Sequence, residues 1–229
     1  MPTEQPFDKN NHRILLLSAF EPELAYLIQE RPALENRRVN GLRLEFEFGF
    51  CGVGSVSAAC WLTRRLEQER IGFDEILFIG SAGSYQGAQI PMGAFALASE
   101  FAQVDAAVIQ GKAHIPEIQT SRLAAVPGRL AACLGRNHAW QMGLVCNSTQ
   151  SVSLTAFRED ELQSQNIHLE NLEAFGLAMA AAQKPIPFCA LLAVTNLVGP
   201  NGSMEWQLHF RNLGRQLNEK FLAALPPNR

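Results

Sequence analysis

Short apolar runs alternate with amphipathic helical patterns along the whole chain. Leucine and phenylalanine occupy every second position at 42–48, after the turn dipeptide Asn40-Gly41, which predicts a strand after a tight turn. Apolar runs predict further strands at 13–18, 75–80, 95–104, 141–146 and 188–195. Helical patterns lie at 21–30, 55–69, 174–183 and 203–225, with a short helix expected within 122–135. Strands that alternate with helices predict a three-layer α/β/α domain with a central mixed, largely parallel sheet.

The predicted helix at 174–183 is unusually apolar, and it is preceded directly by Glu173. Alanine and leucine dominate this segment, and no charged residue follows until Lys184, so the helix is expected to be buried. A carboxylate is rarely left at such a place unless it is paired or does chemistry. Taken alone, Glu173 supports two interpretations, a cap of the first helical turn or a functional carboxylate.

Size and charge limit the classes of function. The 229 residues, of which 47% are hydrophobic, suit one domain at 13–225 behind a polar N-terminal extension at 1–12. The net charge is −3, and no basic stripe marks a nucleic-acid partner. The apolar runs at 14–20 and 188–194 are far shorter than the roughly 18 residues of a membrane-spanning helix, so no membrane partner is expected.

Cysteine and histidine spacing argues against disulfides and metals. The cysteines are odd in number and widely spaced, without a Cys-x-x-Cys pair: Cys51, Cys60, Cys133, Cys146 and Cys189. This predicts buried free thiols in a reducing compartment, and the N-terminus lacks an apolar signal region, so a cytoplasmic protein is expected. The five histidines show no metal-ligand spacing, and no metal or cofactor is expected.

Chemistry-bearing residues gather where predicted strands end. In an α/β fold, ligands bind beyond the carboxyl ends of the strands. Glu21 and Glu23 follow the first strand, Gly-Ser-Ala-Gly at 80–83 ends the third, and Asn196 lies at the end of the last. With Glu173, these features bring carboxylates, a glycine-rich loop and an amide to one crevice, which suits recognition of a sugar joined to a heterocycle.

Five short motifs resemble the nucleoside phosphorylase/nucleosidase superfamily in their order and spacing. They are FEPE at 20–23, GVG at 52–54, GSAG at 80–83, ENLE at 170–173 and TNLVGP at 195–200. The nearest branches are methylthioadenosine/S-adenosylhomocysteine nucleosidase and futalosine hydrolase, and the resemblance covers about 13–225. It implies a homodimer in which a neighbour's residues close the pocket, and 100–108 lies in the corresponding region.

The resemblance also implies roles for individual residues. Glu23 matches the base that deprotonates the attacking water, Glu173 the carboxylate that binds the ribose 2′- and 3′-hydroxyls, and Asn196 the residue that contacts purine N7. Further matches to substrate-binding positions are Phe20, Ser81, Ala82, Gly83, Val152 and Leu172. These residue types suit cleavage of an N-glycosidic bond, because carboxylates stabilise an oxocarbenium-like sugar and activate water.

Two departures from the superfamily pattern narrow the expected reaction. Adenine-specific nucleosidases carry an acidic aspartate at the position of Asn196, whereas an amide can pair with O6 and N7–H of a 6-oxopurine such as hypoxanthine. Phosphorylases carry an arginine at the position of Phe78, and its loss removes the natural phosphate partner. We therefore expect hydrolysis of a purine nucleoside, most similar to that of futalosine hydrolase.

Three alternatives stay open: a methylthioadenosine/S-adenosylhomocysteine nucleosidase, a purine nucleoside phosphorylase, and a nucleoside-binding member without activity. The last follows from the loose match of 147–153 to the superfamily's base-covering segment. Trp206 is expected to pack in the core or at the rim rather than against the base. His168 and His209 are expected to be structural.

Overall fold

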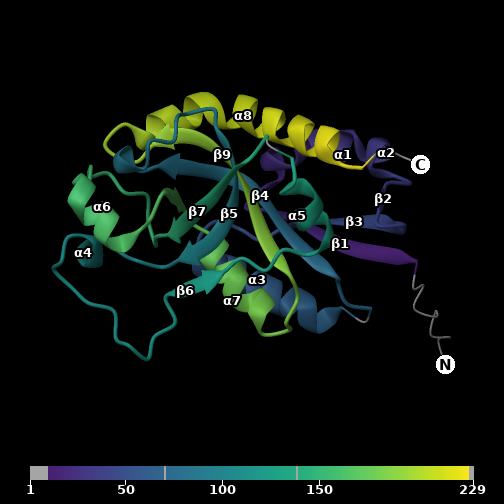
Figure 1. The fold of residues 1–229 in the computed structure, drawn as a ribbon, viewed down its shortest axis with the longest axis horizontal. Coiled ribbons are helices and arrows are strands. Elements are labelled where there is room, and N and C mark those ends of the chain that lie inside the picture. Colours follow the sequence, from purple (N-terminus) through teal and green to yellow (C-terminus); the bar gives the residue numbers. More distant parts are fainter. Residues whose placement is uncertain (1–9, 70, 138, 227–229) are drawn as a thin grey trace.

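A single mixed sheet runs through the described part of the chain, residues 10–69, 71–137 and 139–226 of a computed structural model (Figure 1). Helices cover both faces of the sheet, so the predicted three-layer α/β architecture is confirmed. The strands are β1 (Asn11–Ser18), β2 (Arg38–Val39), β3 (Leu42–Phe50), β4 (Glu75–Ser84), β5 (Phe95–Ala102), β6 (Arg122–Ala124), β7 (Gln141–Ser148), β8 (Leu169–Asn171) and β9 (Phe188–Leu197).

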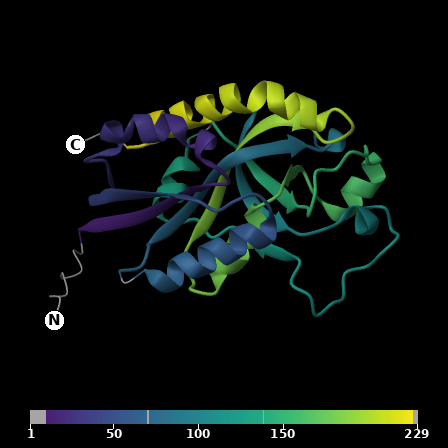
Figure 2. The ribbon, with the colours of Figure 1, turned by 180° about the vertical axis from the view of Figure 1, so that it is seen from behind.

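The helical layers follow from the alternation of side chains along the strands. Ile14 and Leu16 of β1 pack in one core cluster with α8 (Gly202–Ala224), whereas Leu15 and Leu17 pack in another with α3 (Ser55–Gln68) and α7 (Ala174–Ala182). Figure 2 shows these two layers on opposite sides of the sheet. The other helices are η1 (Glu21–Glu23), α1 (Ala25–Gln29), α2 (Arg31–Leu34), η2 (Gln86–Ala88), α4 (Ala106–Ile109), α5 (Arg129–Leu134) and α6 (Glu159–Gln165).

The strand pairing closes part of the sheet on itself. β4 is parallel to β1 and β9, and its last residues pair antiparallel with β8. β9 also pairs with β5, β5 with β7, and β7 with β8, so β4, β9, β5, β7 and β8 form a closed ring. The ring was not predicted from the sequence. It places the carboxyl end of β4 between β8 and β9.

Several predicted boundaries differ from the structure. The motif at 80–83 was expected to end its strand, but β4 continues to Ser84 because β9 pairs with it along its whole length. The expected helix at 21–30 is broken into η1 and α1, with Pro22 in the first turn. β1 begins at Asn11, two residues earlier than expected, while 1–9 of the N-terminal extension lie outside the described residues.

The five cysteines are free thiols, of which Cys51, Cys146 and Cys189 are buried, Cys133 is half-buried and Cys60 is exposed. No helix in this part of the chain is long and apolar enough to cross a membrane. Within the same residues, no group of three or more histidine, cysteine, aspartate or glutamate side chains could hold a metal ion.

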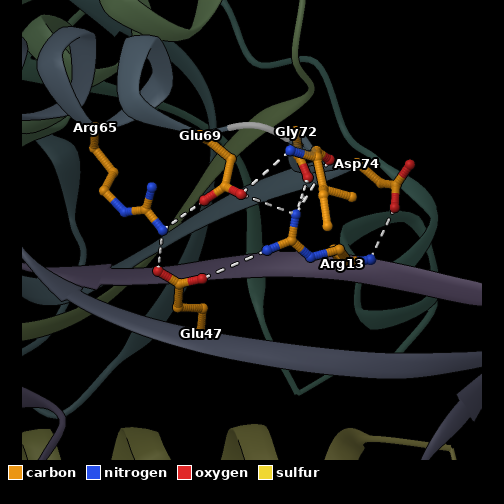
Figure 3. A network of polar contacts seen from close by, with 7 residues as sticks. Arg13, Glu47, Arg65, Glu69, Gly72 and Asp74 are labelled. Carbon is orange, nitrogen blue, oxygen red and sulfur yellow. Dashed lines mark hydrogen bonds and ion pairs between the residues drawn. The ribbon is translucent and has the colours of Figure 1, made fainter. Parts of the chain in front are cut away.

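An ion-pair network joins three elements at the amino end of β1 (Figure 3). Arg13 of β1 lies 3.4 Å from a carboxylate oxygen of Glu69, and Arg65 of α3 lies 2.6 Å from the other. Both arginines also pair with Glu47 of β3. Their guanidinium groups lie over the ring of Phe73, at 4.9 and 5.2 Å from its centroid. The network therefore ties β1, β3 and the end of α3 together.

Candidate active site

A cavity of about 330 Å³ lies where β1, β4, β8 and β9 end. This volume falls within the usual range for small-molecule sites. Every residue that the sequence assigned to the site lines it: Phe20, Glu23, Ser81, Ala82, Gly83, Val152, Leu172, Glu173 and Asn196. Segments up to 176 residues apart in the chain are thus brought to one place, as expected for strand ends that share one edge of a sheet.

Glu23 is held by three neutral donors. One carboxylate oxygen accepts hydrogen bonds from the backbone N–H and the hydroxyl of Ser81, both at 3.0 Å, and the other accepts from the Ala19 N–H at 3.2 Å. Burial and, to a smaller extent, the charge of Glu173 raise the pKa of Glu23 to about 8, although these hydrogen bonds act to lower it. Near neutral pH, Glu23 is therefore poised to exchange a proton.

Glu173 does not cap its helix. The side-chain oxygen of Asn171 accepts from the N–H groups of Glu173 and Ala174, both at 2.8 Å, and so caps α7 instead. Glu173 makes no capping bond, and its carboxylate accepts from Asn171 Nδ2 at 2.8 Å and from the Gly54 N–H at 3.0 Å. The capping interpretation of Glu173 is therefore wrong. Burial raises the pKa of this carboxyl as well.

The contact between Glu173 and Gly54 depends on a close approach of two helices. Gly54 precedes α3 with φ of +95°, a conformation that favours glycine, and its N–H belongs to the positive end of that helix. Gly176 of α7 packs directly against Ser55, where an added Cβ would lie 2.1 Å from the Ser55 carbonyl oxygen. Only glycine at 176 therefore lets α7 bring Glu173 to the start of α3.

A β-bulge directs Asn196 into the cavity. Ala82 pairs with Val194, but Gly83 pairs with Asn196, so Thr195 is an extra residue in β9. Asn196 then lies over Gly83, where a Cβ would come within 2.7 Å of its Nδ2. The Thr195 hydroxyl donates to Asn196 Oδ1 at 2.9 Å, and Nδ2 donates to the Leu197 carbonyl at 3.1 Å. Among the described residues no further partner is recorded, so one acceptor site on Oδ1 and one N–H of the amide are left for a ligand.

Trp206, near the start of α8, also lines the cavity. Its indole N–H donates to the Ser81 hydroxyl at 3.0 Å, and its ring stacks on Phe210 with centroids 4.4 Å apart. Because the hydroxyl accepts from Trp206, its own proton points to Glu23. Gly202, Ser203, Trp206 and Gln207 share one face of α8, and this helical spacing is the signal that could have identified them.

His168 and Phe78, which the sequence analysis also considered, do not line the cavity. His168 accepts from the Val145 N–H at 3.1 Å, and burial lowers its pKa, as expected of a structural histidine. Phe78 is fully buried in the core and lies beside Gly80.

The sequence analysis did not assign two residues of β8 that line the cavity, Glu170 and Asn171. The segment 100–108 spans the end of β5 and the start of α4, and its contact with a second subunit stays a prediction.

Comparison with known proteins places the chain in a family. The model of the phosphorylase superfamily matches residues 13–225, nearly the whole chain. The chain belongs to this superfamily. No curated protein matches it significantly.

Solved structures of similar fold include nucleosidases. That of 5′-methylthioadenosine/S-adenosylhomocysteine nucleosidase from Helicobacter pylori, with butyl-thio-DADMe-Immucillin-A, superposes with a TM-score of 0.74 at 14% identity, covering 93% of this chain and 97% of that one. For S-adenosylhomocysteine nucleosidase from Streptococcus pyogenes, with 5-methylthiotubericidin, the TM-score is 0.73 at 20% identity, over 96% and 100% of the two chains. At these identities the likeness shows the fold.

The cavity of this superfamily member is acidic. Three carboxylates line it, those of Glu23, Glu170 and Glu173, and among the described residues no lysine or arginine does. None of the ion pairs in the described part of the chain includes Glu23 or Glu173. The described residues thus offer the cavity no cation for an anionic substrate, whereas a developing positive charge would be stabilised there.

Proposed function

We propose that this superfamily member hydrolyses the N-glycosidic bond of a purine nucleoside and releases the free base, with a 6-oxopurine as the preferred base. The observation that carries the proposal is the placement of two buried carboxylates, Glu23 and Glu173, in one cavity with the amide of Asn196. No lysine or arginine of the described ranges lines this cavity. Cleavage of this bond builds positive charge on the sugar, and such a cavity favours that charge.

Glu173 would bind the ribose. Its two oxygens already accept from Asn171 and Gly54, which leaves two acceptor sites for the 2′- and 3′-hydroxyls. Hydrogen bonds to a carboxylate are stronger than those between neutral groups, so this contact would fix the sugar in place. Substrate hydroxyls would also replace some of the hydration that burial removes from Glu173.

Glu23 would act as general base. Its pKa of about 8 suits removal of a proton from water near neutral pH, and its hydrogen bonds to Ser81 and Ala19 hold it in position. Once ionised, the carboxylate also stabilises the cationic sugar. A phosphorylase would need a cationic partner for phosphate, and Phe78 supplies none.

Asn196 would contact the leaving purine. The free N–H of its amide can donate to O6, and the open site on Oδ1 can accept from N7–H of a departing 6-oxopurine. Methylthioadenosine/S-adenosylhomocysteine nucleosidase activity is the second candidate, because the similar solved structures carry that name. Val152 and Leu172 would pack against the substrate from the cavity wall.

Incubation with inosine, futalosine and methylthioadenosine, with and without phosphate, tests the proposal by measurement of free base. We expect phosphate-independent release, fastest from a 6-oxopurine nucleoside. Preference for methylthioadenosine would favour the second candidate, and a strict need for phosphate with ribose 1-phosphate as product would establish phosphorolysis. Tight nucleoside binding without any release, in a folded sample, would show a binding protein instead.

The assembly and the cellular location are part of the same proposal. We expect a cytoplasmic homodimer in which 100–108 of one subunit approaches the cavity of the other. Light scattering of the purified chain gives the mass of the particle in solution. A monomer that hydrolyses nucleosides at full rate would refute the dimer and leave the reaction intact.

A further inference from the structure

A second cavity, of about 440 Å³, lies between η1, α1 and α8. Figures 1 and 2 both show α1 beside the carboxyl-terminal part of α8, and these two helices are in contact. The volume falls within the usual range for small-molecule sites. Six polar side chains in its wall carry the argument, and none of them lines the candidate active site: Glu21, Tyr26, Glu30, Arg211, Arg215 and Asn218.

The amide of Asn218 has a buried oxygen without a partner. Its Nδ2 donates to the backbone carbonyl of Glu23 at 2.8 Å and also to that of Gly214, so both amide hydrogens are used. Its Oδ1 accepts no hydrogen bond from the described residues, although Asn218 is only 1% exposed. Buried polar atoms of native proteins nearly always have a hydrogen-bond partner. Because Asn218 lines the second cavity, we expect the missing donor to come from a molecule that enters this cavity.

Charged groups of both signs line the second cavity without pairing with each other. The carboxylates of Glu21 and Glu30 make no hydrogen bond or ion pair within the described ranges of the chain. The guanidinium of Arg211 lies over the ring of Phe210, 5.1 Å from its centroid, and contacts no carboxylate of these ranges. Both signs of charge are therefore left for a ligand.

The two arginines lie one turn apart on α8. Arg211 and Arg215 have the i, i+4 spacing, so they share the face of the helix that borders the cavity. Glu219 accepts from Arg215 Nε at 2.8 Å, and the ring centroid of Tyr26 lies 5.5 Å from the same guanidinium. The terminal Nη groups of Arg215 have no partner in the described part of the chain. Guanidinium groups bind carboxylates through paired hydrogen bonds, so this side of the cavity suits a carboxylate.

We propose that the second cavity binds a small zwitterion, a molecule that carries both an ammonium group and a carboxylate. The carboxylate pairs with the arginines of α8, and the ammonium supplies the donor that Asn218 Oδ1 lacks. Glu21 and Glu30 attract the ammonium end. An anion alone would meet these two glutamates, and a cation alone would meet the two arginines. The inference does not rest on the proposed function.

The second cavity is joined to the candidate active site through Glu23. The backbone carbonyl of Glu23 accepts from Asn218, whereas the side chain of Glu23 lines the first cavity. The N–H of Leu24 belongs to the same peptide unit as that carbonyl. A ligand that contacts Asn218 therefore changes the surroundings of two groups that can be observed separately, the Asn218 amide and the Leu24 N–H.

An NMR titration of the full ¹⁵N-labelled chain tests the inference without any turnover. The probes are two zwitterions that differ in the separation of their charges, glycine and 4-aminobutanoate. Their single-charge counterparts are acetate and methylammonium for glycine, and butanoate and butylammonium for 4-aminobutanoate. We expect at least one zwitterion to shift the Asn218 NH₂ and Leu24 N–H signals to saturation, about tenfold or more tightly than either of its counterparts.

Arg211→Gln removes one cation from the cavity wall, and Arg64→Gln is the matched control. Arg64 is likewise an exposed arginine on a helix, α3, but it does not line the second cavity. Arg211→Gln should weaken zwitterion binding about tenfold, whereas Arg64→Gln should leave it within about twofold. The ¹⁵N spectrum of each variant also shows whether it is folded.

Three results would overturn the inference. One is that neither zwitterion gives a saturable shift, and another is that a single-charge counterpart binds as tightly as its zwitterion. The third is binding that leaves the Asn218 amide unshifted or that both arginine variants weaken equally.

The two proposals fail separately. Zwitterion binding by a folded protein that cleaves no nucleoside would remove the proposed function and retain this site. Nucleoside hydrolysis by a protein that binds neither zwitterion would do the reverse.

Discussion

The two ends of β1 hold glutamates in opposite electrostatic settings. At the amino end, Arg13 and Arg65 contact Glu47 and Glu69, and these charged groups remain partly exposed. At the carboxyl end, Glu23 is 6% exposed and is contacted by N–H and O–H donors that carry no charge. A buried carboxylate without a cationic partner is costly for folding, so its presence indicates that the carboxylate has a functional role.

The pKa values follow this contrast. Burial acts to raise the pKa of Glu69, but hydrogen bonds from Arg65 and Ile71, with the charges of Arg13 and Arg65, hold it below its usual value. Burial and the nearby charge of Glu173 raise the pKa of Glu23 to about 8. Pairing with arginine therefore keeps a carboxylate ionised and structural, whereas neutral donors leave its proton available near neutral pH.

The largest effect is expected from Glu23→Gln, which removes the base and keeps the shape of the side chain. Nucleoside hydrolysis should fall by about 10²–10⁴-fold in kcat/KM, the usual contribution of a general base. The matched change at the other end of β1, Glu69→Gln, should leave kcat/KM within about twofold because that residue lies outside the cavity. Equal losses of kcat/KM in the two variants would show that Glu23 has no special role in the reaction.

Glu173→Gln should lower kcat/KM by about 10²–10³-fold, through loss of the charge that stabilises the cationic sugar. It should also change the pH dependence. In the wild type, kcat/KM should rise as pH approaches 8, because Glu23 must lose its proton to act as base. Without the charge of Glu173, this rise should move to lower pH. A pH–rate profile of the variant measures the shift, and an unmoved midpoint would show that the two carboxylates are not coupled.

Stability should respond to pH in opposite directions at the two ends. The folded protein keeps the Glu23 proton up to a pKa of about 8, whereas the unfolded chain releases it near 4.5, so Glu23 makes stability fall as pH rises between these values. Glu23→Gln should therefore stabilise the fold more at pH 9 than at pH 5, by an amount on the order of 3 kcal/mol. Urea denaturation at both pH values measures this, and a pH-independent difference would contradict the raised pKa.

The smallest effect is expected within the network at the amino end. The pKa of Glu69 is lowered, so its stabilising contribution is present at neutral pH and is lost as pH falls below its usual pKa. A double-mutant cycle with Arg65→Met and Glu69→Gln should give a coupling of about 0.5–1 kcal/mol at pH 7 that decreases with added salt. A coupling that is absent at low salt would show that the network does not stabilise the fold.

The parts of the site that could be predicted from sequence are those next to strand ends. Glu23 and Asn196 follow apolar runs, and parallel strands bring such positions together without further information. Glu170 and Trp206 were not assigned, because their roles depend on partners distant in the chain. Glu170 accepts from the hydroxyls of Ser153 and Tyr85, 17 and 85 residues away, and Trp206 donates to the hydroxyl of Ser81, 125 residues away.

The elements of the fold also differ in how well they could be predicted from the sequence. Long strands and α8 could be predicted because their apolar periodicity is strong, whereas β8 has three residues and exists only because β4 and β7 pair with it. The bulge at Thr195 leaves no signal in the residue pattern, since it is a mismatch between two strands. The continuation of β4 through Gly80 and Gly83 was missed for a related reason, because glycines in sequence suggest a turn.

Gly176 has no atom in the cavity, yet its missing side chain governs the position of Glu173. Replacement by alanine would push α7 and α3 apart at Ser55 and carry the Gly54 N–H away from Glu173. A random mutagenesis screen for lost nucleoside binding should therefore recover substitutions at this position, in the middle of an apolar helix. Such variants would look like ligand-contact mutations in an assay, although the altered residue never meets the ligand.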